Sequence, residues 1–188
     1  MFKRVIFTLA SVASIQAFGA WDIAPDESSL HFLTTKNAQV TEVHSFETLS
    51  GTLSEDGKLT VSVDLASVNT LIPIRNTRMQ EMLFNVAQFP TATFSADIDK
   101  TLLNVPVGKQ IQATVTGTLK LHGVEAPAEF AVNLTRSTKG KFVVSTTKPG
   151  LIRANTFKLE QGVEALRNIA GLNSITLTVP VTFSVTFE

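Results

Sequence analysis

The chain has 188 residues, with 16 basic and 16 acidic side chains, 44% hydrophobic residues, no cysteine and no tyrosine. This length suits one domain with a substantial core, and the high hydrophobic content without net charge excludes a disordered chain. The charge balance argues against a nucleic-acid-binding protein, and the lack of cysteine excludes disulfides, thiolate nucleophiles and cysteine-ligated metals.

Residues 1–20 have the pattern of a secretory signal peptide. Lys3 and Arg4 form a basic start, and a short apolar stretch leads into small residues before a more polar chain. The apolar stretch is too short to span a bilayer. We therefore expect cleavage near residues 19–20, export of the mature chain, and a single domain over residues 21–188.

Beyond Trp21, apolar and polar residues alternate, which is typical of half-buried β-strands. The clearest run is the last one, where apolar residues from Ile175 to Phe187 share one face and mainly Thr and Ser occupy the other. Pro180 in this run lacks an amide donor, so we expect it at a sheet edge or bulge. Turn sequences separate the runs. The pattern predicts about eight strands, near residues 30–32, 40–53, 59–65, 92–98, 111–121, 128–134, 141–146 and 175–187.

Two segments depart from this alternation and predict short helices. Residues 77–84 combine capping-box spacing at Thr77 with apolar residues at helical spacing. Residues 163–170 repeat the helical spacing and are followed by Gly171 at a position that suits a helix C-terminus.

About eight alternating strands are compatible with three architectures. One is a lipocalin-like, eight-stranded antiparallel barrel with its apolar face inward. A second is an outer-membrane barrel with that face toward lipid, but its interfacial girdles require tyrosine and tryptophan, and this chain has one Trp and no Tyr. A third is an open β-sandwich, which alternation does not exclude. We predict the all-β lipocalin-like barrel with two short helices.

The sequence nominates no catalytic or metal site. It has three histidines, of which His31 lies opposite an apolar strand face and His122 sits in a glycine turn. His44 and Glu42 point to one side of a strand, but zinc normally requires three or four protein ligands, so we interpret them as a surface pair. No nucleotide-binding, hydrolase or zinc-protease motif is present. We expect no enzyme activity, no cofactor and no metal.

Phenylalanine is the more informative residue type. Ten phenylalanines follow residue 20. Phe has no hydroxyl group that needs a partner when buried, so it suits both a packed core and a dry pocket for an apolar ligand. Met79 and Met82 could adapt to an irregular chain in such a pocket. Periodicity alone does not choose between a filled and a hollow barrel.

Several short motifs occur in an order that resembles the YceI-like family of lipid- and polyisoprenoid-binding periplasmic proteins. The resemblance covers nearly all of residues 21–188. It rests on Trp21-Asp22-Ile23-Ala24-Pro25 with Ser28-Ser29-Leu30-His31-Phe32, on Ser67-Val68-Asn69-Thr70 with Arg75-Asn76 and Phe84, on Phe89-Pro90-Thr91-Ala92-Thr93-Phe94, on Gly117-Thr118-Leu119-Lys120-Leu121-His122-Gly123-Val124 with Pro127, and on Ile152-Arg153-Ala154-Asn155 with Phe157.

This resemblance implies an eight-stranded barrel whose apolar tunnel holds a polyisoprenoid, such as a quinone tail or polyprenyl lipid, in the periplasm. The chain departs from the family pattern at Ala24, where the family often has Asp, and at Glu27, Lys36 and Arg78, where it often has His, so the resemblance assigns these four residues no role toward a polar head group. The ligand-binding residues that we predict are Phe32, Phe46, Arg75, Met79, Met82, Leu83, Phe84, Phe89, Phe94, Val115 and Phe130.

Two other hypotheses remain at this point. One is a stress-related structural or interaction protein whose barrel is filled by side chains and holds no ligand. The other is an enzyme acting on a lipid head group, which requires titratable groups at the barrel mouth. An exposed sheet edge could also pair two copies of the chain into a homodimer. We expect no nucleic-acid partner and no membrane-spanning segment.

Overall fold

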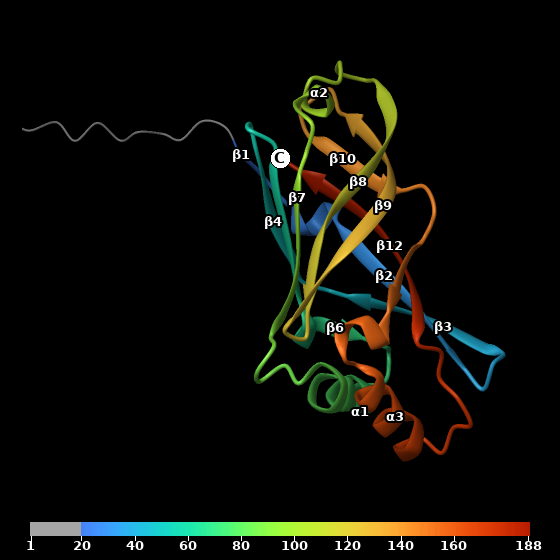
Figure 1. The fold of residues 1–188 in the computed structure, drawn as a ribbon. Helices are drawn as coiled ribbons and strands as arrows, with labels where there is room; N and C mark the ends of the chain where they lie inside the picture. The colour runs from blue at the N-terminus through green and yellow to red at the C-terminus, as the bar shows by residue number, and fades with distance from the viewer. Residues whose placement is uncertain (1–19) are drawn as a thin grey trace, which may run out of the picture.

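The computed structural model describes residues 20–188, so the signal peptide predicted at residues 1–20 lies almost wholly outside the described residues. The described chain is an elongated barrel of antiparallel strands (Figure 1). Two helices, α1 (Pro73–Arg78) and α3 (Glu160–Ile169), lie together at one end. The short helix α2 (Lys100–Leu103) lies at the opposite end.

The described residues form twelve strands in one sheet, in the order β1-β4-β5-β7-β8-β9-β10-β12-β2-β3-β6, with β11 also paired to β12. Their bounds are β1 Ala20–Asp22, β2 Ser29–Lys36, β3 Val40–Phe46, β4 Leu49–Ser54, β5 Lys58–Asp64, β6 Val68–Asn69, β7 Thr91–Asp97, β8 Gln110–Leu121, β9 Val124–Arg136, β10 Phe142–Thr146, β11 Gly150–Arg153 and β12 Thr178–Phe187. The strand count exceeds the eight predicted because β1, β6 and β11 are too short to show alternation, and because residues 40–53 hold two strands.

Strand β1 closes the sheet into a barrel. It pairs with β4 on one side, and the adjacent Ile23 forms a bridge with Phe187 of β12 on the other. The backbone amides of Asp22 and Glu188 each donate to the carbonyl oxygen of the other at 2.9 Å. This closure removes a free edge and excludes the open sandwich. The predicted lipocalin-like, all-β architecture is confirmed.

Pro180 lies inside β12 rather than at a bulge. It is paired with Leu151 of β11, but the ladder between β12 and β2 begins only at Val181. Pro180 therefore lies just beyond the end of the ladder with β2, which its missing amide does not interrupt.

The first predicted helix begins earlier than the sequence suggested. Helix α1 starts at Pro73, and Thr77 lies inside it, with its hydroxyl donating to the Pro73 carbonyl at 3.3 Å. Proline suits the first helical turn because its fixed φ matches the helix and its missing amide has no partner there anyway. A π-helix, η3 (Met79–Phe84), continues α1 and ends at Asn85 in the left-handed conformation. The second predicted helix, with Gly171 after its end at φ +62°, is confirmed as α3.

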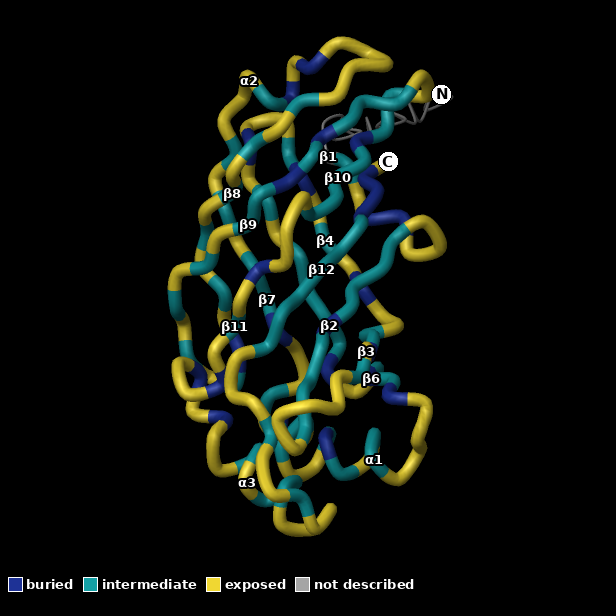
Figure 2. The backbone as a smooth tube through the Cα atoms, turned by 90° about the vertical axis from the view of Figure 1, so that its right-hand side faces the viewer, coloured by how far each residue is buried: buried dark blue, intermediate teal, exposed yellow. Residues whose placement is uncertain are grey.

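The buried residues form two clusters rather than one continuous core. One surrounds Phe32, Leu65 and Phe84 at the helical end, and the other surrounds Phe142 and Phe187 near α2. Between them the inward residues of the strands are only half-buried, as the intermediate colour along most strands shows (Figure 2). In a filled barrel such residues would be fully buried. The interior of this barrel is therefore hollow in its middle section.

Helix α3 covers part of the helical end, where it packs tightly on η3. A Cβ atom built on Gly162 would lie 2.7 Å from the carbonyl oxygen of Met82 and 2.8 Å from the Cα of Leu83. Both are backbone atoms, so they cannot move aside as a flexible side chain would. The close approach of the two helices therefore depends on glycine at this position.

We expect Gly162→Ala to lower the free energy of unfolding by about 1–3 kcal/mol, the usual cost of overpacking. An exposed glycine in a helix normally gains roughly 1 kcal/mol on this change, so the expected sign is the opposite of helix propensity. Urea unfolding measures the effect. Gln161→Ala, on the exposed side of the same helix, is the matched control and should change stability by less than about 0.5 kcal/mol. A stabilised Gly162→Ala variant would contradict the packing described.

Candidate ligand-binding cavity

A cavity of about 570 Å³ runs inside the barrel between the two buried clusters. Its wall comes from inward residues of the strands together with α1, η3 and α3. The cavity opens at the helical end, as the exposure of its lining there shows. Ile72, Ile74 and Ile169 line the cavity and are 44–57% exposed. Near α2 it ends on Leu103 and Phe187, which are buried. A volume of this size is ordinary for a small-molecule pocket.

Nine of the eleven predicted ligand-binding residues line this cavity: Phe32, Phe46, Arg75, Met79, Leu83, Phe84, Phe94, Val115 and Phe130. The aromatic members also contact each other. Phe32 stacks on Phe46 with ring centroids 5.1 Å apart, and Phe94 meets Phe130 edge-on at 5.5 Å. Since successive strand residues face opposite ways, the period of two predicts that these phenylalanines share the inward face, and the strand register brings them into contact.

Met82 and Phe89 do not lie in the cavity wall. Met82 is on the exposed side of η3, with 37% of its surface accessible. Phe89 lies outside the barrel wall against the turn between β8 and β9, where its ring is 4.7 Å from the His122 ring and also contacts Gly123. Met82 lies in the π-helix η3, where the wider turn changes the direction that α-helical spacing predicts, and Phe89 lies in the irregular chain before β7, where no period predicts direction.

A group of polar side chains at the helical end was missed by the sequence reasoning. Besides Arg75, the cavity is lined there by Thr34, Lys36, Glu42, His44 and Arg78. Thr34 and Lys36 continue the same inward face of β2 as Leu30 and Phe32. The alternation could therefore have shown that this face changes from apolar to polar along the strand.

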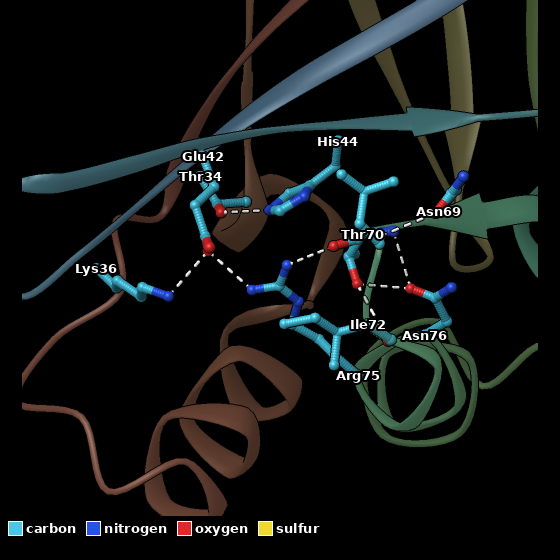
Figure 3. A network of polar contacts seen from close by, with 10 residues as sticks. Thr34, Lys36, Glu42, His44, Asn69, Thr70, Ile72, Arg75 and Asn76 are labelled. Carbon is cyan, nitrogen blue, oxygen red and sulfur yellow. Dashed lines mark hydrogen bonds and ion pairs between the residues drawn. The ribbon is translucent and has the colours of Figure 1, made fainter.

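Glu42 holds two cations at this end of the cavity (Figure 3). Its carboxylate accepts from Lys36 Nζ at 3.0 Å and from Arg75 Nη1 at 2.8 Å. Arg75 also donates through Nη2 to the Thr70 carbonyl at 2.6 Å. These bonds fasten α1 to strand β3 and to the segment before α1, and they position the Arg75 guanidinium at the cavity wall.

His44 is 5% exposed and lines the cavity beside Phe32, whose ring centroid is 5.2 Å away. Its Nε2 is 3.0 Å from the Thr34 hydroxyl, whereas its Nδ1 has no hydrogen-bond partner among the described residues. Burial, reinforced by the nearby Arg75 charge, lowers the pKa of His44 from its ordinary 6.5. The pKa of Glu42 is lowered, mainly by the hydrogen bond from Lys36 and also by the charge and hydrogen bond of Arg75. Partial burial raises this pKa but does not outweigh them. At neutral pH this end therefore holds a neutral imidazole and an ionised carboxylate.

Stability should depend on His44 in a defined pH window. Its pKa is lower in the folded than in the unfolded chain, so its contribution is present above pH 6.5 and is lost as pH falls toward the folded-state pKa. We expect the free energy of unfolding to fall between pH 7 and pH 5, and to fall less steeply in His44→Gln. Urea unfolding across that range measures the slope. Equal slopes in the two proteins would contradict the assignment of the pH effect to His44.

Residues 20–188 contain no group of three His, Asp or Glu side chains that could hold a metal ion. None of the helices in that range is long and apolar enough to cross a membrane.

His44 and Glu42 both face the cavity, but no hydrogen bond joins them. His44 is hydrogen-bonded to Thr34, and Glu42 is bonded to Lys36 and Arg75.

The profile of the YceI-like domain matches residues 21–187. The chain belongs to the YceI-like family. The family predicted from the short motifs is confirmed over almost the whole described chain.

Solved structures of two relatives share this barrel. A polyisoprenoid-binding domain from Saccharophagus degradans is 37% identical, with a TM-score of 0.86 over 89% of this chain and 97% of that one. BcnA from Burkholderia cenocepacia is 17% identical, with a TM-score of 0.63 over 87% of this chain and 98% of that one, and supports the fold only. No match was found among curated proteins.

Proposed function

We propose that this YceI-like protein binds a long apolar lipid, of the polyisoprenoid or quinone type, inside the barrel and without chemical conversion. The single observation that carries the proposal is the hollow barrel with a wall of Phe, Leu, Val and Ile side chains. Water beside an apolar wall finds few hydrogen-bond partners, so an apolar chain in this cavity displaces water that is weakly held. The Saccharophagus degradans relative, described as polyisoprenoid-binding, supports the same class of ligand.

The expected affinity follows from buried hydrocarbon. Each CH₂ group contributes about 0.8 kcal/mol, so one five-carbon isoprene unit contributes on the order of 3–4 kcal/mol before ordering costs. A few units are therefore sufficient for tight binding after translational and conformational entropy are subtracted. The alternative of a filled barrel requires an interior without a continuous apolar cavity, and the 570 Å³ cavity argues against it.

Lipid extraction from the purified protein, followed by mass spectrometry, tests the proposal directly. We expect one class of long-chain lipid in repeated preparations and a rise in melting temperature when polyprenyl lipid is returned to the stripped protein. Recovery of that lipid with unchanged mass supports binding without catalysis. Preparations that carry no lipid, together with no thermal stabilisation by added polyprenyl lipid, would refute it.

We also propose a periplasmic location, supported by the signal-peptide pattern of residues 1–20. Cell fractionation and N-terminal sequencing of the mature protein test it, with an N-terminus near residue 20 as the expected result. A homodimer stays a prediction, and analytical ultracentrifugation tests it.

A further inference from the structure

The cavity is polar at one end only. Inward residues of β2 and β3 face each other across the ladder, and successive pairs change from Leu30 with Phe46 to Phe32 with His44 and then to Thr34 with Glu42. The opposite end is closed by Leu103, Leu134 and Phe187, with the fully buried Phe142 behind them. A lipid that matches this change from apolar to polar lining has its tail toward α2 and its head group beside α1.

Cations outnumber carboxylates at the polar end. Lys36, Arg75 and Arg78 line the cavity there against the single carboxylate of Glu42. Glu42 already bonds both Lys36 and Arg75. Arg78 is half-buried and forms no ion pair with any residue in the range 20–188. With His44 neutral, the polar end therefore carries an excess of about two positive charges, which is costly beside a low-dielectric cavity.

Two buried nitrogen atoms at the same end have no hydrogen-bond partner within residues 20–188. They are Nδ1 of His44, a side chain only 5% exposed, and Nε of Arg75. Buried polar atoms in native proteins are almost always hydrogen-bonded. Two such nitrogen atoms without partners beside one end of the cavity therefore indicate that the ligand supplies their hydrogen-bond partner. A neutral quinone could accept a hydrogen bond here but would leave the positive charge uncompensated.

We infer that the ligand is a single-chain lipid with a phosphate monoester head, bound beside Arg78, Arg75 and His44 at the helical end. This inference rests on the proposed function and deepens it. A phosphate monoester carries about −1.5 to −2 charges at neutral pH, which matches the excess of positive charge, and it offers three acceptor oxygens. Arginine is well suited to bind it because the guanidinium donates in a planar fork.

The test compares lipids that share a tail and differ in the head group. Lipid-free protein is titrated with geranylgeranyl monophosphate, with geranylgeraniol and with palmitate, and inorganic phosphate is added alone as a further arm. We expect the monophosphate to bind at least about tenfold more tightly than the alcohol, since a hydrogen bond to a charged group has that effect or more. Inorganic phosphate alone should not raise the melting temperature, because without a buried tail its affinity is too weak to shift the unfolding equilibrium.

Arg78→Gln should weaken binding of the monophosphate about tenfold and leave binding of the alcohol unchanged. The matched control is Arg153→Gln, because Arg153 is exposed and lies outside the cavity wall. Three results would each overturn the phosphate head group while leaving lipid binding intact. They are tighter binding of the alcohol or of palmitate than of the monophosphate, an unchanged preference for the monophosphate in Arg78→Gln, and stabilisation by inorganic phosphate alone. Failure of both the monophosphate and the alcohol to bind would overturn the proposed function as well.

Discussion

Ala113→Trp should abolish lipid binding while the barrel stays folded. Ala113 faces the cavity from the first half of β8, opposite Val132 of β9, and both residues line the wall. An indole at this position would occupy space that is empty in the lipid-free barrel, so it displaces the ligand's hydrocarbon rather than packed protein atoms. Filling an existing void avoids the strain that normally accompanies overpacking.

The magnitude of this effect is large. We expect a loss of at least about 100-fold in affinity, because several isoprene units lose their place and each contributes about 3–4 kcal/mol before ordering costs. In the parent protein, lipid at roughly 100 times its dissociation constant should stabilise the fold by about 2.7 kcal/mol, equivalent to about 5–10 °C in melting temperature. That shift should disappear in Ala113→Trp.

Thr114→Trp is the matched control, since Thr114 neighbours Ala113 on the same strand and faces solvent. It should keep both the affinity and the lipid-dependent thermal shift. Circular dichroism of the two lipid-free variants establishes that each is folded. Undiminished lipid binding by a folded Ala113→Trp variant would show that the lipid binds elsewhere than in the barrel.

Phe142→Ala should be the most destabilising single truncation of an aromatic side chain at the α2 end. Phe142 has no exposed surface, meets Trp21 edge-on with ring centroids 5.0 Å apart, and lies 5.3 Å from the Arg136 guanidinium. Through Trp21 it supports β1, the strand that closes the barrel. We expect a loss of about 3–5 kcal/mol in the free energy of unfolding, the usual cost of removing a fully buried phenyl group.

Phe183→Ala provides the comparison. Phe183 is also an inward phenylalanine, but it is half-buried and lines the cavity, so part of its ring has no packed neighbours to lose. We expect its truncation to cost less than about 2 kcal/mol, because a side chain that borders a void is only partly withdrawn from water. Urea unfolding of the lipid-free proteins measures both values. Equal losses would indicate that the cavity is filled in solution.

The polar end of the cavity shows where sequence reasoning reached its limit. The alternation places Thr34 and Lys36 on the same face as Phe32, but it does not say that Glu42 and His44 lie opposite them, because that depends on the register of β2 with β3. Arg75 and Arg78 arrive on a helix that is more than thirty residues distant from Glu42 in the chain. For this reason the sequence favours a surface pair for Glu42 and His44, and the structure corrects that interpretation: both residues line the cavity.

The sequence by itself determined the all-β class, the inward position of most phenylalanines, the α3 helix and the family, because each of these depends on local period or short motifs. Only the tertiary structure decided that the barrel is hollow, since an inward residue alternates in the same way whether it meets another side chain or empty space. The absence of tyrosine is compatible with a dry interior, but closure through β1 and the separation of two buried clusters create that interior. The position of the polar end of the cavity likewise required the fold, because it is defined by charges of the β2–β3 hairpin and of the distant helix α1, which meet only in the folded barrel.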